Sequence, residues 1–143
     1  CVPHLKKASN PHILNLSPPL SMKSKWFKKH VAYTMSKYGM SMCTLGMSEE
    51  FKKDGIAVNS LWPKTIIATA AISNNFPKVV YHASRKPAIV ADAAYEILTS
   101  DSRQVTGNFF IDEHLLKERG VSDFKHYAMH RFVPLYPDIF VDD

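Results

Sequence analysis

The chain has 143 residues, of which 45% are hydrophobic, and its formal net charge is +5. This size and composition fit one ordinary domain with a core, and the mildly basic charge permits an anionic partner without requiring one. No stretch approaches the roughly 20 apolar residues of a membrane span, and no signal peptide opens the chain. The two cysteines, Cys1 and Cys43, argue against a disulfide framework and favour a reducing, intracellular compartment.

The first predicted elements are a helix end and a short strand. Residues 1–7 have the pattern of the last turns of a helix, and Asn10-Pro11 then breaks the chain. Residues 13–16 are short and apolar enough for a strand of a parallel sheet that is buried on both faces. Pro18 and Pro19 end this strand.

Ser17 follows the predicted strand directly. Open α/β sheets bind their ligands beyond the carboxyl ends of the strands, so Ser17 is a candidate site residue. Three interpretations stay open. Ser17 acts after a local shift, Ser21 takes its place, or no serine takes part and Ser17 only ends the strand.

Residues 23–29 interleave lysines with Trp26 and Phe27. Basic residues among aromatics suit a nucleic-acid or anionic-membrane surface. The favoured interpretation is a solvated loop that leads into the next helix, with the two aromatic side chains at the mouth of an active site.

A long helix is predicted from residue 32 to residue 53, with Gly55 as its C-terminal stop. Tyr33 and Lys37 are four residues apart, so they share one face of its first turns and face the sheet end where Ser17 emerges. A neighbouring lysine cation favours the phenolate, which makes a tyrosine usable in proton transfer. The expected buried stripe consists of Met40, Cys43 or Thr44, Met47 and Phe51.

The remaining pattern predicts two more strands and one more helix. Residues 56–62 form a second apolar strand that Pro63 closes, and residues 107–112 form the last strand. Pro87 opens a helix that reaches about residue 99, with Ile89, Ala93, Ile97 and Leu98 on its buried face. Residues 65–81 lack periodicity and are predicted to form a substrate lid.

The order of strand, serine, helix with Tyr and Lys, strand and proline resembles the short-chain dehydrogenase/reductase family. The family signature Ala-Tyr-x-x-Ser-Lys is matched at Ala32, Tyr33, Ser36 and Lys37. The resemblance implies an α/β fold, the C-terminal half of a Rossmann-like doubly wound parallel sheet with about three strands. It assigns residues 1–120 to that catalytic half and residues 121–143 to an extended tail. The phosphate-binding half is predicted to be missing, because the five glycines form no Gly-x-Gly.

The resemblance also implies a function, the NAD(P)-dependent oxidation or reduction of an alcohol/carbonyl pair. Tyr33 is then the general acid/base, and Lys37 lowers the pKa of Tyr33 and holds the nicotinamide ribose. Ser17 polarises the substrate carbonyl, although Pro18 stands where the family places its functional serine. Backbone groups just beyond Pro63 hold the nicotinamide, which points to Lys64, Thr65 and Ile66.

The resemblance does not decide between NAD and NADP, since the residue that would decide it is expected upstream of Cys1. The expected partners are a small alcohol or carbonyl compound, lipid-like ones included, and a second subunit that packs on the helix of residues 32–53. Nucleic acid is not expected, and a peroxisomal or mitochondrial location is implied only by the resemblance. The chain alone is expected to be inactive.

Two functions of other classes remain as alternatives. One is a small basic module that binds nucleic acid or anionic lipid through residues 23–29, and the other is an inactive pseudo-enzyme that only packs against partners. A zinc site at His126 and His130 is disfavoured, because no Glu follows the first histidine. These histidines are expected to be solvated.

Overall fold

The computed structural model describes residues 1–142, and Asp143, the last residue of the predicted tail, lies outside the described residues. Three parallel strands form one sheet in the order β1-β2-β3, with β1 at His12–Asn15, β2 at Ala57–Trp62 and β3 at Phe109–Ile111. The α-helices are α1 (Val2–Leu5), α2 (Val31–Glu50), α3 (Ala70–Asn75), α4 (Lys78–His82), α5 (Ala88–Leu98) and α6 (Asp112–Glu118). The 3₁₀ turns are η1 (Ser24–Trp26), η2 (Lys52–Asp54) and η3 (Lys125–Tyr127).

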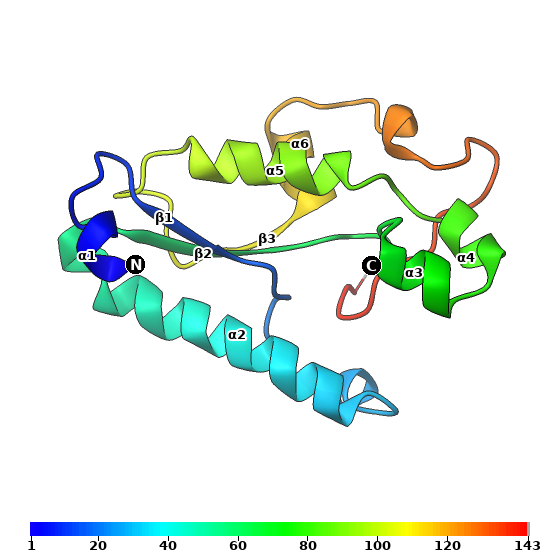
Figure 1. The fold of residues 1–143 in the computed structure, drawn as a ribbon, viewed down its shortest axis with the longest axis horizontal. Helices are drawn as coiled ribbons and strands as arrows, with labels where there is room; N and C mark the ends of the chain where they lie inside the picture. Colours follow the sequence, from blue (N-terminus) through cyan, green and yellow to red (C-terminus); the bar gives the residue numbers. More distant parts are fainter. Residues whose placement is uncertain (143) are drawn as a thin grey trace.

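These elements form three layers. Figure 1 shows α2 against one face of the sheet and α5 with α6 against the other. The predicted Rossmann-like α/β architecture with three parallel strands is therefore confirmed. No helix among residues 1–142 is long and apolar enough to cross a membrane.

The central strand β2 is buried along its whole length, as its apolar run predicts. β1 is only half-buried, so the prediction of burial on both faces is wrong for this strand. The reason is its position, because β1 pairs with β2 alone and forms one edge of the described sheet. On the α5 side, the core consists of Leu61, Ile89, Ala93, Ile97, Leu115, Leu116 and Tyr127.

The face of α5 is as predicted, with Ile89, Ala93 and Ile97 buried, while Leu98 stays exposed. Gly55 ends the η2 turn after α2 with a left-handed φ of 69°, which glycine adopts without strain. A Cβ there would lie 2.9 Å from the guanidinium carbon of the exposed Arg103, a flexible side chain that can move aside, so the backbone conformation is the reason for glycine.

The buried stripe of α2 matches the predicted one only at Thr44, the alternative to Cys43. Cys43 is exposed, and Met40, Met47 and Phe51 are only half-buried. The buried positions are Thr34, Tyr38, Ser41, Thr44 and Ser48. Small hydroxyl side chains let a helix approach a sheet closely, and their hydroxyls are satisfied by hydrogen bonds rather than by water.

The predicted extended tail is more structured than expected. It contains the η3 turn, and its last residues return to the carboxyl end of the sheet (Figure 1). Phe140 is only 4% exposed and packs with Tyr38, Trp62 and Ile111. Large apolar side chains in the tail, which can be buried only by folding back, explain the difference.

Candidate active site

Tyr33 and Lys37 lie on the first turns of α2, at the carboxyl end of the sheet. The Lys37 ammonium donates a hydrogen bond to the carbonyl oxygen of Leu16, the residue after β1, at 3.1 Å. Its nitrogen also lies 5.3 Å from the centroid of the ring of Trp62, which ends β2. Lys37 is therefore held at the strand ends where α/β sheets bind ligands.

The phenol of Tyr33 is 45% exposed, and one face of its ring stacks on Phe140 at a centroid distance of 6.1 Å. Burial raises the pKa of Tyr33, and the negative charge of Asp138 raises it further. The predicted lowering of this pKa by Lys37 is thus wrong for this arrangement. The ammonium is directed at Leu16 and Trp62, while a carboxylate from the C-terminal segment acts on the phenol.

Asp138 is the acidic group that the sequence analysis misses. Burial raises the pKa of Asp138 to about 6, and the negative charge of Asp112 adds to this, although the Ile139 N–H and the charge of Lys37 oppose it. Asp138 is fixed by its backbone N–H, which donates to the carbonyl oxygen of Lys64 at 3.0 Å. Its position within a proline-punctuated tail carries no local signal of a site.

Ser17 does not face the opening beside Tyr33. It is fully buried, and its hydroxyl lies 2.8 Å from that of Ser60 on β2. The Ser60 hydroxyl lies 2.8 Å from that of Thr44, which also accepts a hydrogen bond from the Asn15 amide at 2.8 Å. Ser17 belongs to this buried hydroxyl chain between α2 and the sheet, so the carbonyl-polarising role predicted for it does not fit the structure.

Ser21 lies half-buried on the loop after β1, and its hydroxyl accepts a hydrogen bond from the Lys23 N–H at 3.4 Å. The interpretation in which Ser21 replaces Ser17 stays a prediction.

The loop after Pro63 is joined to the C-terminal segment. The Ile66 N–H donates to the Tyr136 carbonyl at 3.0 Å, and the Ile66 carbonyl accepts from the Arg85 N–H at 2.9 Å. Both backbone groups predicted to hold a nicotinamide at Ile66 therefore have partners within the protein. At Lys37 the donors do fit a nicotinamide ribose, because an ammonium has three N–H groups and Leu16 accepts one of them.

The basic stretch packs against the same segment. Lys23 lies 2.5 Å from a carboxylate oxygen of Asp142, and Lys25 binds the other oxygen. Trp26 meets Phe140 edge-on at 6.0 Å, and Phe27 meets Tyr38 at 5.6 Å. This arrangement fits the predicted loop leading into the helix. As to metals, no cluster of three His, Cys, Asp or Glu side chains that could hold an ion is found in residues 1–142.

Comparison with known proteins bears on this site. No model of a protein family matches the chain. Hydroxysteroid dehydrogenase-like protein 2 of Xenopus laevis is 56% identical over 143 residues, which is all of this chain and 34% of that protein. The chain thus spans about one third of the length of the curated relatives it matches.

Solved structures agree with that match. A short chain dehydrogenase from Mycobacterium thermoresistibile is 44% identical with a TM-score of 0.89, over 99% of this chain and 50% of that one. The chain belongs to the short-chain dehydrogenase/reductase family. An angucycline C-6 ketoreductase, solved with bound NADP, is 23% identical with a TM-score of 0.53, over 71% of this chain and 41% of that one. At that identity it shows the shared fold alone.

Within this family resemblance, Tyr33 and Lys37 stand at the two signature positions, and the structure places both at the carboxyl end of the sheet. The residues around them that the motif does not name are Asp138, Phe140 and Trp62. Two of these come from the C-terminal segment, which is distant in sequence from the signature and joins it only through folding.

Proposed function

We propose that this chain carries the acid–base residues of an NAD(P)-dependent oxidoreductase that interconverts an alcohol and a carbonyl. The observation that carries the proposal is the anchoring of the Lys37 ammonium on the Leu16 carbonyl, one helical turn from the half-exposed phenol of Tyr33. Membership of the short-chain dehydrogenase/reductase family supports it. Among solved structures that share the fold, one carries NADP and another NADH, so we propose a nicotinamide cofactor without choosing between NADP and NAD.

Tyr33 donates or accepts the proton of the reaction. Burial and the charge of Asp138 raise its pKa, so the phenol is protonated at neutral pH. A protonated phenol is a general acid, which suits donation of the proton to the oxygen of a substrate carbonyl during reduction. Oxidation of the alcohol needs the phenolate and should therefore increase with pH. The cofactor, when bound, supplies the hydride.

Lys37 would hold the cofactor ribose with the N–H groups that Leu16 does not use. Pro63 and Thr65 remain proposed cofactor contacts. The Lys64 N–H donates to Asp112 Oδ1 at 2.9 Å and its carbonyl accepts from the Asp138 N–H at 3.0 Å, so Lys64 can contact the cofactor through its backbone only if one of these bonds opens. Ile66 can join them only if the hydrogen bonds of its backbone to Tyr136 and Arg85 open. Binding of the cofactor at Ile66 would then require movement of residues 136–138.

The basic binding module is the weaker alternative. Lys23 and Lys25 are occupied by Asp142, and Trp26 packs on Phe140 instead of presenting its ring for stacking on bases. The substrate and the subcellular location of the whole protein stay predictions.

The test uses the full-length protein. Tyr33→Phe keeps the ring and removes the proton donor, so turnover should fall by about 10²–10⁴-fold while cofactor binding survives. Lys37→Met should weaken cofactor binding as well, and Lys37→Arg should not fully restore it, because the planar fork replaces a compact ammonium. Tyr95→Phe, at an exposed position on α5, is the matched control. More than about a tenth of wild-type turnover in Tyr33→Phe would remove Tyr33 from the acid–base role.

A further inference from the structure

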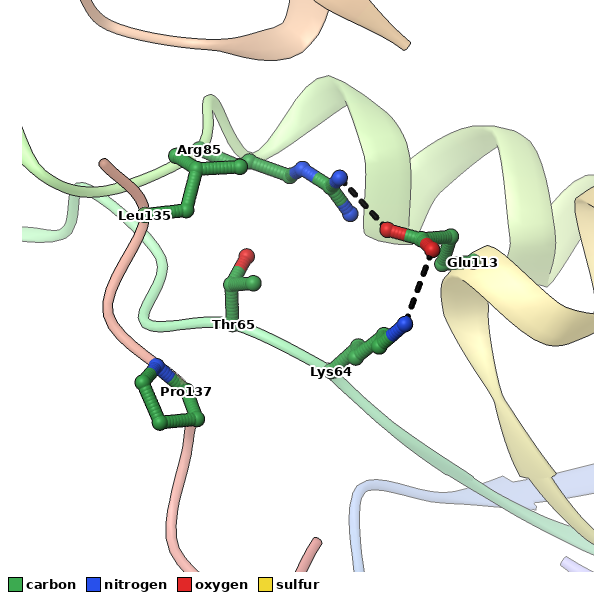
Figure 2. A pocket seen from close by; sticks show the side chains of 6 residues that line it. All are labelled: Lys64, Thr65, Arg85, Glu113, Leu135 and Pro137. Atoms are coloured by element: carbon green, nitrogen blue, oxygen red, sulfur yellow. Dashed lines mark hydrogen bonds and ion pairs between the residues drawn. The ribbon is translucent and has the colours of Figure 1, made fainter. Parts of the chain in front are cut away.

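A second polar site lies beside the C-terminal segment and uses neither Tyr33 nor Lys37. It is a pocket of about 270 Å³, lined by Lys64, Thr65, Arg85, Glu113, Leu135 and Pro137. Figure 2 shows Arg85 and Lys64 reaching Glu113 from two sides, with the Thr65 hydroxyl directed toward the guanidinium and Leu135 and Pro137 on the opposite wall.

Arg85 is held rigidly in this pocket. Its backbone N–H donates to Ile66 at 2.9 Å, and its carbonyl accepts from the Ala68 N–H at 2.8 Å. The guanidinium carbon lies 5.5 Å from the centroid of the Phe124 ring, and one nitrogen, Nη2, lies 2.5 Å from Glu113. The side chain is only 7% exposed, so its direction is fixed by the fold.

The pocket offers hydrogen-bond donors that the protein itself does not use. Arg85 Nε and Nη1 and the Thr65 hydroxyl are buried and have no hydrogen-bond partner among the described residues. Buried donors are normally satisfied, because leaving one without an acceptor is costly. Nε and Nη1 lie on different edges of the guanidinium group, so an acceptor with more than one oxygen suits Nη1 and the nearby Thr65 hydroxyl together.

The charges around the pocket select the type of acceptor. Burial raises the pKa of Glu113, but hydrogen bonds from Lys117, Lys64 and Arg85 outweigh burial and hold this pKa at about 2. Three cations, Lys64, Arg85 and Lys117, therefore contact Glu113. The residues that line the pocket carry two cations, Lys64 and Arg85, and one anion, Glu113, and this surplus of one positive charge matches a monoanion better than a phosphate dianion.

We propose that this pocket binds the carboxylate of a small organic acid. The edge of the Arg85 guanidinium formed by Nη1 and Nη2 matches the two oxygens of a carboxylate, with Nη2 shared with Glu113, and the Thr65 hydroxyl and the Lys64 ammonium complete its shell. Leu135 and Pro137 form an apolar wall for a short hydrocarbon chain. Glu113 acts as a positioning residue that holds the two cationic side chains in place.

Isothermal titration calorimetry of the full-length protein with butyrate, butyramide and inorganic phosphate tests this inference. Butyrate should bind saturably, and neither the neutral amide nor phosphate should match it. Thr65→Val removes the hydroxyl at constant shape and Arg85→Lys removes the guanidinium group, so each should weaken butyrate binding by about tenfold or more.

Lys117→Gln is the matched control. Lys117 binds the same carboxylate of Glu113, at 2.6 Å, and carries the same charge as Lys64, but it does not line the pocket. It should change butyrate affinity much less than Thr65→Val, which stays informative even if Arg85→Lys unfolds the protein. The proposal is overturned if butyrate does not saturate, if butyramide or phosphate binds as well, or if Lys117→Gln loses as much affinity as Thr65→Val.

Discussion

Asp138→Asn offers a direct test of the electrostatics beside Tyr33. The substitution keeps the shape of the side chain and an oxygen that can accept the Ile139 N–H at 2.7 Å, but it removes the ionisable group. Asp138 has a pKa of about 6 in the folded protein, against an ordinary value of 3.8 for an aspartate. Folding therefore disfavours the ionised form of this carboxyl.

The sign and size of the effect on stability follow from these two pKa values. Below pH 3.8 the carboxyl is protonated in both states and costs nothing. Between pH 3.8 and about 6 the unfolded chain ionises first, so wild-type stability falls as the pH rises. A difference of about two units corresponds to about 3 kcal/mol at 1.36 kcal/mol per unit, and partial exposure of the site reduces this to about 1–2 kcal/mol.

Urea unfolding at pH 4 and pH 7.5, in the full-length protein, measures this difference. Relative to wild type, the free energy of unfolding of Asp138→Asn should be about 1–2 kcal/mol more favourable to the folded state at pH 7.5 than at pH 4. Asp142→Asn is the control, because Asp142 lies in the same segment with its pKa lowered by hydrogen bonds from Lys23 and Lys25, so its removal should have no such benefit. If the difference in unfolding free energy between Asp138→Asn and wild type is the same at both pH values, or is smaller at pH 7.5, the reasoning is refuted.

Three other substitutions probe the surroundings of the site. Phe140→Ala should destabilise the protein by about 3–5 kcal/mol in urea unfolding, since the side chain is almost fully buried; a loss below about 1 kcal/mol would show that the segment contributes little. Ser60→Ala should cost about 1–3 kcal/mol by depriving the hydroxyls of Ser17 and Thr44 of a partner, with exposed Ser36→Ala as the near-neutral reference. Changing the four lysines of residues 23–29 to Gln should leave turnover largely intact, and strong salt-dependent retention on a polyanion column that this change abolishes would favour the binding module.

The fold was predictable because its signals are local and repeated. The continuous apolar run of β2 indicates a fully buried strand. The spacing of Ile89, Ala93 and Ile97 indicates the buried face of the helix α5. The stripe on α2 was not predictable in this way. Thr34, Ser41 and Thr44 are polar by type, and their burial is favourable only because each hydroxyl finds a partner in the folded chain. These partners are the carbonyl oxygens of Trp26 and Pro18 and the hydroxyl of Ser60, respectively.

For the candidate site, the motif gives the residues of one helix but not their environment. Tyr33 and Lys37 are four positions apart, so their shared face follows from helical geometry alone. The raised pKa of Tyr33 does not follow, because it depends on burial by the folded chain and on the charge of Asp138, which is more than 100 residues away in the sequence. The role of Ser17 could not be predicted from its local sequence either. Its place after a strand is local information, while its hydrogen bond to Ser60 depends on the pairing of β1 with β2.

One segment supports both of the sites described. Pro137 lines the carboxylate pocket, the next residue, Asp138, raises the pKa of Tyr33, and Phe140 stacks on the Tyr33 ring. The backbone of this segment is hydrogen-bonded to Lys64 and Ile66, on the loop that supplies the rest of the pocket. A ligand that binds Lys64 and packs on Pro137 therefore contacts both of the loop segments that position Asp138. A movement of residues 137–140 would therefore change both the wall of the pocket and the surroundings of Tyr33.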